Sequence, residues 1–205
     1  MFRELFESSL SRLWRHNEAH DCGALTAFRK YNNCGYKDGK PCPSENTPIE
    51  LTHKENQKRN LALAADLKSK GYNITKIMGT YPEGGKTVTE VSYFVVDADD
   101  KGTLEKDLKK LGEKYNQDSI LFIPKGAIKN ETKAYLVGTN KCCNNWLGYG
   151  KKEIFNKGKM GYSSPIYTSK INGRPFIFED IKLTDEIFGS STTARLAEKW
   201  SKEIQ

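Results

Sequence analysis

The central part of the chain alternates strand and helix patterns in an order that few folds accommodate. Residues 24–29 have the apolar content of a short buried strand, and residues 119–124 form an apolar strand. Residues 73–81 and 87–98 are strand-like and are separated by a Pro-Glu-Gly-Gly turn. Helix patterns over 52–71 and 103–115 lie between these strands, so the order is β-α-β-β-α-β.

The helix over 52–71 has signals at both ends. Thr52 followed by Glu55 is a capping box, in which the two residues satisfy free N–H groups of the first turn. Gly71 is typical of a helix stop. The helix over 103–115 begins at Thr103 and has leucines at helical spacing. Both patterns therefore predict crossover helices that pack on a sheet.

This order predicts an α+β fold with a ferredoxin-like (split βαβ, βαββαβ) core sheet. Right-handed crossovers place the strands in the order 4-1-3-2, each antiparallel to its neighbours. We expect an amphipathic helix over 1–20, added strands at 133–138 and 174–181, and a C-terminal amphipathic helix over 192–204. The prediction is one domain over 21–205, with a loop insertion at 30–50 and a basic, Gly-rich loop at 139–165.

Composition narrows the class of protein. The 205 residues carry a net charge of +7, which favours an anionic partner or a lysine-rich solubilising surface. No apolar run approaches the ~20 residues of a membrane span, and the N-terminus has no secretory signal pattern. We therefore expect no membrane partner and a place in the cytoplasm.

The five cysteines do not resemble a secreted disulfide framework, because their number is odd and their spacing irregular. Cys34 and Cys42 flank a turn and could approach each other. No CxxC pair or Cys/His set has zinc-ligand spacing. The sequence predicts free thiols in a reducing compartment, no metal site and no cofactor.

Four polar blocks fall at the ends of elements that meet at one edge of the predicted sheet. Arginines there could bind a phosphate or carboxylate, and Glu90 could orient an arginine or accept a proton. The candidate ligand-binding residues are Arg29, Asn56, Arg59, Asn60, Glu90 and Gln117. The alternative is structural. Asn56 and Asn60 would bond loop carbonyls, Arg59 and Glu90 would form a buried tie, and Gln117 would cap loop backbone.

A second candidate region is the basic, Gly-rich loop. Basic and aromatic side chains on a loop can pair with phosphates and stack on bases. The candidate nucleic-acid-binding residues are Tyr149, Lys151, Lys152, Lys157 and Lys159. A solvated loop has the same composition.

The polar blocks resemble those of an uncharacterised domain family of bacteria and tailed bacteriophages. The similarity covers most of residues 20–180, and the cysteine-bearing insertion at 34–43 departs from the compact family pattern. The matching blocks are Thr26-Ala27-Phe28-Arg29, Glu55-Asn56 with Arg59-Asn60, Glu90 with Ser92-Tyr93-Phe94, and Gln117-Asp118-Ser119. No activity comes with the resemblance, which implies a phage-type origin rather than a mechanism.

Residues 1–7 also look similar to capsid-targeting leaders of internal head proteins, which are cut after a hydrophobic-x-Glu sequence, here Leu5-Phe6-Glu7. A protein with such a leader would be packaged in the virion and injected with the DNA. The alternative is an ordinary amphipathic helix.

The sequence favours binding over catalysis, because it has no Walker loop, GxSxG elbow or HExxH motif. We expect a phage accessory protein that binds a nucleotide, a nucleic acid or a host defence factor in host takeover or counter-defence. One alternative is an internal virion protein, located in the virion interior rather than the host cytoplasm. The other is a small nucleotide- or nucleic-acid-processing enzyme, with Glu90 as general base and with Arg29 and Arg59 holding phosphate. The expected partners are an anionic ligand, nucleic acid or a host protein, and the sequence does not indicate the oligomeric state.

Overall fold

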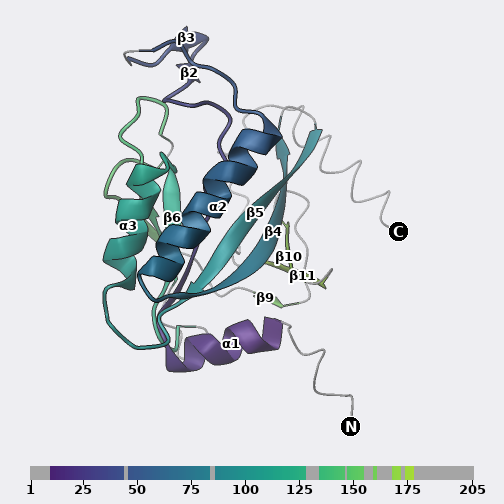
Figure 1. Cartoon of the computed structure of the whole chain (residues 1–205), viewed down its shortest axis with the longest axis vertical. Coiled ribbons are helices and arrows are strands. Elements are labelled where there is room, and N and C mark those ends of the chain that lie inside the picture. The colour runs from purple at the N-terminus through teal and green to yellow at the C-terminus, as the bar shows by residue number, and fades with distance from the viewer. Residues whose placement is uncertain are drawn as a thin grey trace.

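A computed structural model describes residues 10–43, 46–83, 86–127, 134–145, 147–154, 159–160, 168–171 and 174–177. Within them a nine-stranded antiparallel sheet carries helices on both faces, which confirms the predicted α+β class (Figure 1). The core strands are β1 (Cys22–Leu25), β4 (Asn73–Glu83), β5 (Lys86–Val96) and β6 (Ser119–Ile123). They lie side by side as β6-β1-β5-β4, all antiparallel, which is the order predicted from the sequence.

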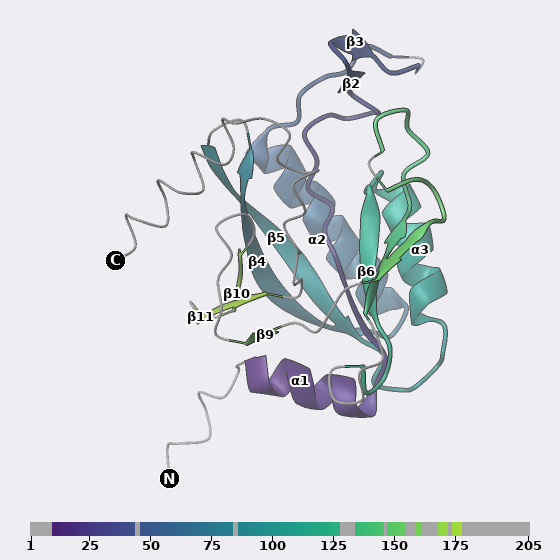
Figure 2. The ribbon, with the colours of Figure 1, turned by 180° about the vertical axis from the view of Figure 1, so that it is seen from behind.

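Further strands extend this sheet on both sides. Next to β6 lie β7 (Tyr135–Gly138) and then β8 (Lys152–Ile154). Next to β4 lie β10 (Thr168–Ile171), β11 (Arg174–Ile177) and β9 (Lys159–Met160), which Figure 2 shows from behind. The sequence predicted β7 and the start of β11, but it did not predict β8, β9 or β10. The expected C-terminal helix over 192–204 lies outside the described residues.

Helices α2 (His53–Ser69) and α3 (Leu104–Lys114) cover one face of the sheet. The Thr52–Glu55 capping box is present in both directions, as predicted. Thr103 flanks α3, but its side chain makes no bond to the helix backbone and instead bonds Asp107 and Tyr72. Leu63 and Leu67 of α2 and Leu104, Leu108 and Leu111 of α3 pack on the sheet in one buried cluster.

Helix α1 (Leu10–Ala19) packs on the opposite face. Leu13 contributes to a second apolar cluster with Phe94 and Val96 of β5. Asn17 is fully buried and donates through Nδ2 to the carbonyl oxygens of Ile123 and Pro124, at 3.2 and 2.9 Å. The predicted N-terminal helix therefore exists over these residues and is docked, while residues 1–7, with the proposed leader, lie outside the described residues.

The insertion at 30–50 contains a short hairpin of β2 (Tyr36–Lys37) and β3 (Lys40–Pro41). Its base is closed by a bridge between Tyr31 and Glu50. Figure 1 shows this hairpin beyond the N-terminal end of α2, at the end of the sheet where β1 stops. In the described part of the chain, no helix is long and apolar enough to span a membrane.

Candidate ligand-binding site

Strand β1 is shorter than its neighbour β5. At the end of β1, the N-terminal half of β5 therefore extends past it and leaves a step in the sheet. β1 pairs with β5 only up to Leu25, which lies opposite Tyr93. The sequence predicted a strand through residue 29, but residues 26–29 leave the ladder. We call the surroundings of this step, formed by residues 26–29, 56–60, 90–91 and 115–118, the polar step.

Two buried asparagines on α2 hold residues 26–29 in place. Asn56 accepts from the Arg29 amide through Oδ1 at 2.9 Å and donates to the Arg29 carbonyl through Nδ2 at 2.8 Å. Asn60 accepts from the Ala27 amide at 3.0 Å and donates to the Val91 carbonyl at 2.9 Å. These side chains replace the partners that a longer β1 would have supplied. Their geometry is that of the structural alternative, in which they bond the backbone of a loop.

Arg59 and Gln117 bind carbonyl groups of the same step. Arg59 donates through Nε to Ala27 at 3.0 Å and through Nη2 to the Tyr115 carbonyl at 2.7 Å, and its guanidinium lies 5.9 Å from the Tyr115 ring centre. Gln117 donates through Nε2 to the carbonyls of Phe28 and Tyr115. Burial lowers the pKa of Arg59. Arg59 therefore brings positive charge to the step while it ties α2 to the end of α3.

Arg29 and Asp118 place opposite charges at the step. Arg29 donates through Nε to the Asn33 carbonyl at 3.0 Å. Burial lowers the pKa of Arg29, the Asp118 carboxylate raises it and the Arg59 charge lowers it. The two residues that follow β7 hold Asp118 in place. The side-chain amide of Asn140 donates to the Asp118 carboxylate, and the backbone amide of Thr139 donates to the Asp118 carbonyl.

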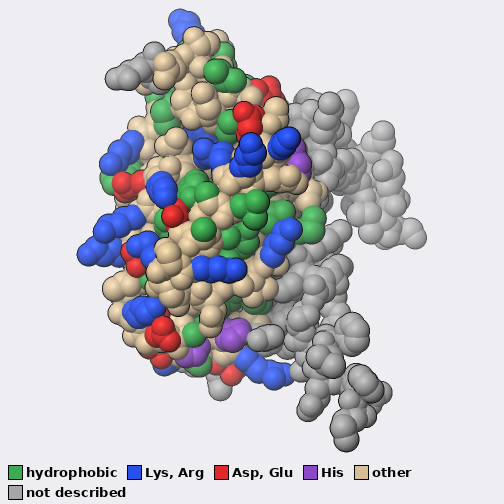
Figure 3. All heavy atoms as spheres, viewed as in Figure 1, with side chains coloured by type: hydrophobic (Ala, Val, Ile, Leu, Met, Phe, Trp, Pro, Cys, Tyr) green, Lys and Arg blue, Asp and Glu red, His purple; other side chains and the backbone are tan. Residues whose placement is uncertain are grey.

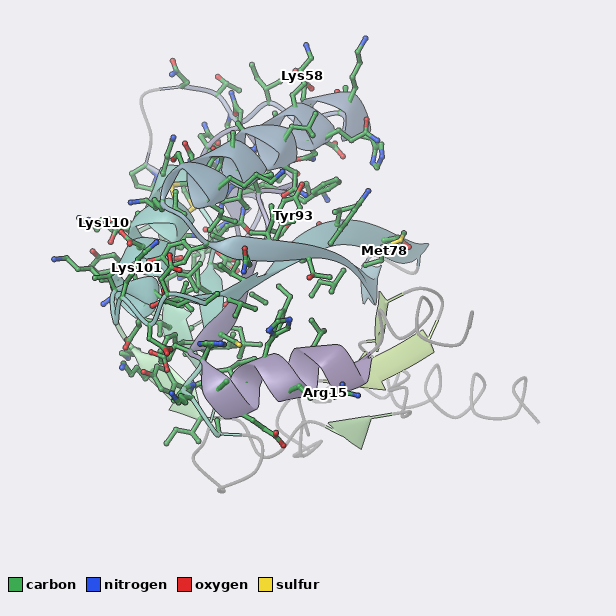
Figure 4. The ribbon with its side chains drawn as sticks, turned by 60° about the horizontal axis from the view of Figure 1, so that its bottom comes forward. Arg15, Lys58, Met78, Tyr93, Lys101 and Lys110 are labelled. Atoms are coloured by element: carbon green, nitrogen blue, oxygen red, sulfur yellow. A yellow bond between two sulfur atoms is a disulfide. The ribbon has the colours of Figure 1, made fainter. Side chains whose placement is uncertain are left out.

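Glu90 lies at the step but on the other face of the sheet. The β4–β5 ladder is regular, so side chains of β5 alternate between faces. Tyr93 and Val95 belong to the cluster under α2, whereas Phe94 and Val96 belong to the cluster over α1. Figure 4 shows Tyr93 on the α2 side. Glu90 shares the parity of Phe94, so its side chain leaves β5 on the face away from α2, and its expected role beside the arginines stays a prediction.

The insertion is fastened to the loop that follows β7. Cys34 is bonded to Cys142 and Cys42 to Cys143, with Cα–Cα distances of 5.3 and 5.9 Å. The prediction of free thiols is therefore wrong for these four cysteines, because the fold brings together residues more than 100 positions apart in sequence. Only Cys22 is a free cysteine, and burial raises its pKa to about 12.

The basic loop is partly engaged with α3. Lys152 pairs with Glu105 at 2.8 Å and lies 4.1 Å from the Tyr135 ring centre, and the Tyr149 hydroxyl donates to Glu113 at 2.6 Å. Lys151 is exposed. Lys157 lies outside the described residues, and Lys159 is described only as part of the backbone of β9. Lys152 and Tyr149 thus bond to glutamates of α3. Nucleic-acid binding by this loop stays a prediction.

On the face seen in Figure 3, lysine and arginine side chains are spread over α2 and α3 with carboxylates between them. Lys114 pairs with Asp66, and Lys70 pairs with Asp107. The same carboxylates accept the hydroxyls of Tyr115 and Tyr72. The charges of Lys70 and Lys114 on this face are therefore balanced locally. No group of three or more His, Cys, Asp or Glu in the described residues could hold a metal ion.

Sequence reasoning did not select Asp118, Thr139 or Asn140. Asp118 follows Gln117 directly, so its position in a polar block was the available signal. The role of Asn140 depends on pairing between β6 and β7, in which Ser119 lies opposite Gly138. No local pattern indicates that contact.

The sequence model of the S-adenosylmethionine lyase family matches residues 49–179. This match covers more than half of the chain, so the protein belongs to the S-adenosylmethionine lyase family, which is associated with bacteriophages. The family match confirms the association with bacteriophages that we expected from the polar blocks. Unlike the uncharacterised family of that resemblance, this family has a named activity. A comparison with curated proteins finds no match.

Proposed function

We propose that the protein binds S-adenosylmethionine at the polar step and cleaves one of its carbon–sulfur bonds. The observation that carries this proposal is the extent of the family match. Residues 49–179 include α2, β5 and the turn before β6, which are three of the four segments that build the polar step. The family match therefore includes Arg59, Glu90 and Asp118 of the polar step, whereas Arg29 lies before its start.

The chemistry of the step suits such a substrate. S-adenosylmethionine carries a carboxylate, an ammonium group and a cationic sulfonium. Arg29 and Arg59 complement the carboxylate, and the carboxylates of Asp118 and Glu90 complement the cations. Because β5 continues past the end of β1, a ligand lying across the step could be approached from both faces of the sheet.

Cleavage of a sulfonium needs no proton donor, because the bonding pair moves onto sulfur and a neutral thioether leaves. The new bond at carbon can come from the substrate's own carboxylate oxygen, which closes a lactone ring. Alternatively, a base removes a proton from the neighbouring carbon, and the electron pair of that C–H bond forms a carbon–carbon double bond. Glu90 is the carboxylate we propose for catalysis, as base or as the group that orients the substrate. Such an activity would deplete a host metabolite, in keeping with a role in host takeover or counter-defence in the host cytoplasm.

The test is to incubate the purified protein with S-adenosylmethionine, separate the products by liquid chromatography and identify them by mass spectrometry. A sample without protein corrects for spontaneous breakdown of the sulfonium. We expect methylthioadenosine to form well above this background, together with homoserine lactone if the substrate carboxylate attacks.

Thermal stabilisation by S-adenosylmethionine without product above background would overturn the lyase proposal. That result would favour the binding-module function expected from the sequence. The absence of both stabilisation and product would exclude S-adenosylmethionine as the ligand.

A further inference from the structure

The insertion at 30–50 contributes none of its described residues to the two apolar clusters of the core. Its short hairpin strands are exposed, and Figure 1 shows them away from the large sheet and its helices. The bridge at its base, between Tyr31 and Glu50, joins the insertion only to itself. The two disulfides to the loop after β7 are therefore the covalent connections that keep the insertion against the rest of the protein.

One of these disulfides starts next to a support of the polar step. Cys34 directly follows Asn33, whose carbonyl accepts from Nε of Arg29 at 3.0 Å. The Cys34 carbonyl itself accepts from Nδ2 of Asn144 at 2.6 Å, so the same stretch of chain meets the loop after β7. The bond between Asn33 and Arg29 therefore depends on how this end of the insertion is held.

The other end of the same disulfide lies next to a second support. The Cys142 backbone amide donates to Oδ1 of Asn140 at 2.7 Å, and the Asn145 side chain donates to the Asn140 carbonyl at 2.9 Å. Nδ2 of Asn140 in turn donates to the carboxylate of Asp118, the residue before β6. The Cys34–Cys142 disulfide thus connects these two supports of the polar step.

Disulfides open by exchange with a dithiol. A thiolate of the reductant attacks one sulfur and forms a mixed disulfide, and the second thiol of the reductant then displaces the protein. The protein gains two electrons and two protons for each bridge, and the dithiol becomes a disulfide. Cys143 is exposed, and Cys34 and Cys142 are half-buried, so each bridge has a residue open to solvent. Protein dithiols keep cytoplasmic thiols reduced, and the disulfides found in that compartment are usually catalytic or redox-sensing.

We propose that the two disulfides are a redox switch for the polar step, opened by a protein dithiol of the host. In the oxidised protein the insertion and the loop after β7 hold both supports in place. In the reduced protein the two segments separate, so Arg29 loses its bond to Asn33 and the hold of Asn140 on Asp118 weakens. The expected effect on turnover rests on the proposed function, whereas the separation of the segments needs no substrate.

The experiment compares oxidised wild-type protein with protein reduced by dithiothreitol. Alkylation and mass spectrometry count the thiols, and hydrogen exchange at short labelling times follows the backbone. We expect faster exchange over 26–35 and 139–145 after reduction, while β4 and β5 stay protected. Turnover of S-adenosylmethionine should fall about tenfold or more, because a shift of about 1 Å in positioning can cost about a hundredfold in rate. Reoxidation should restore it.

Two double variants separate the switch from a general loss of stability. Cys34→Ser with Cys142→Ser removes the disulfide next to the supports, and Cys42→Ser with Cys143→Ser is the matched control. Both disulfides close loops of similar length, 108 and 101 residues, so each variant should lose similar stability. The first variant should behave like reduced wild type in both redox states. The second should keep the response to reductant.

Reduced wild type with unchanged exchange over 26–35 and 139–145, or with full turnover, would overturn the switch. Equal behaviour of the two double variants would overturn it as well, because the disulfides would then act only through overall stability. Cysteines that stay as thiols under oxidising conditions would have the same consequence. Local exchange that responds to reductant, with no product from S-adenosylmethionine in either state, would support the switch while the lyase proposal fails.

Discussion

Asn60→Ala tests whether the buried amides hold the polar step together. Asn60 is 3% exposed and bonds two backbone groups on different segments, the Ala27 amide and the Val91 carbonyl. After truncation to alanine, the Ala27 amide loses its acceptor while Ala27 stays fully buried. The Val91 carbonyl keeps a partner, because the Thr26 hydroxyl donates to it at 2.8 Å.

The magnitude follows from these partners. A buried donor without a partner costs about 1–3 kcal/mol, and the bond to Val91 contributes about 1 kcal/mol. Alanine recovers about 0.6 kcal/mol through its higher helix propensity. We expect the free energy of unfolding to fall by about 1.5–3.5 kcal/mol, which urea denaturation followed by circular dichroism would measure.

Gln57→Ala is the control on the same helix, since Gln57 is exposed and its side chain bonds His53 one turn earlier in α2. Its stability should change by less than about 0.5 kcal/mol. A loss for Asn60→Ala no larger than for Gln57→Ala would refute the reasoning that Asn60 completes the backbone bonding of residues 26–29.

Three other predictions address the cysteines, a carboxylate and the proposed catalytic residue. Reduction of the two disulfides should lower the free energy of unfolding of the wild type by about 2–5 kcal/mol, because they join residues 108 and 101 positions apart. A Cys34→Ser, Cys42→Ser double variant should have the same melting temperature with and without reductant. The Lys114 and Tyr115 hydrogen bonds lower the pKa of Asp66, so its contribution is present above the unfolded-state pKa and is lost as the pH falls through the lower folded-state value. Urea unfolding from about pH 5 downward should therefore show a steeper loss of stability in wild type than in Asp66→Asn. Glu90→Gln should reduce turnover at least tenfold with an unchanged melting temperature, and full turnover would exclude Glu90 from the reaction.

Local sequence determined the elements of the core. The Thr52–Glu55 box and Gly71 fixed the ends of α2 to within a few residues, because caps act over a single turn. Strand alternation and crossover handedness then set the order β6-β1-β5-β4. The same reasoning brought Arg29, Asn56, Arg59, Asn60 and Gln117 to one edge, where the structure has them.

Only the tertiary structure decided how those residues are used. Alternation along β5 puts Glu90 on the same face as Phe94, but only the packing of α2 over the face of Tyr93 and Val95 shows that Glu90 lies on the face away from α2. The amide groups of Asn56 and Asn60 are taken by backbone because β1 stops at Leu25. The partners of Cys34 and Asp118 lie 108 and 22 positions away along the chain. Contacts at such separations come from packing of the whole sheet, and no local pattern encodes them.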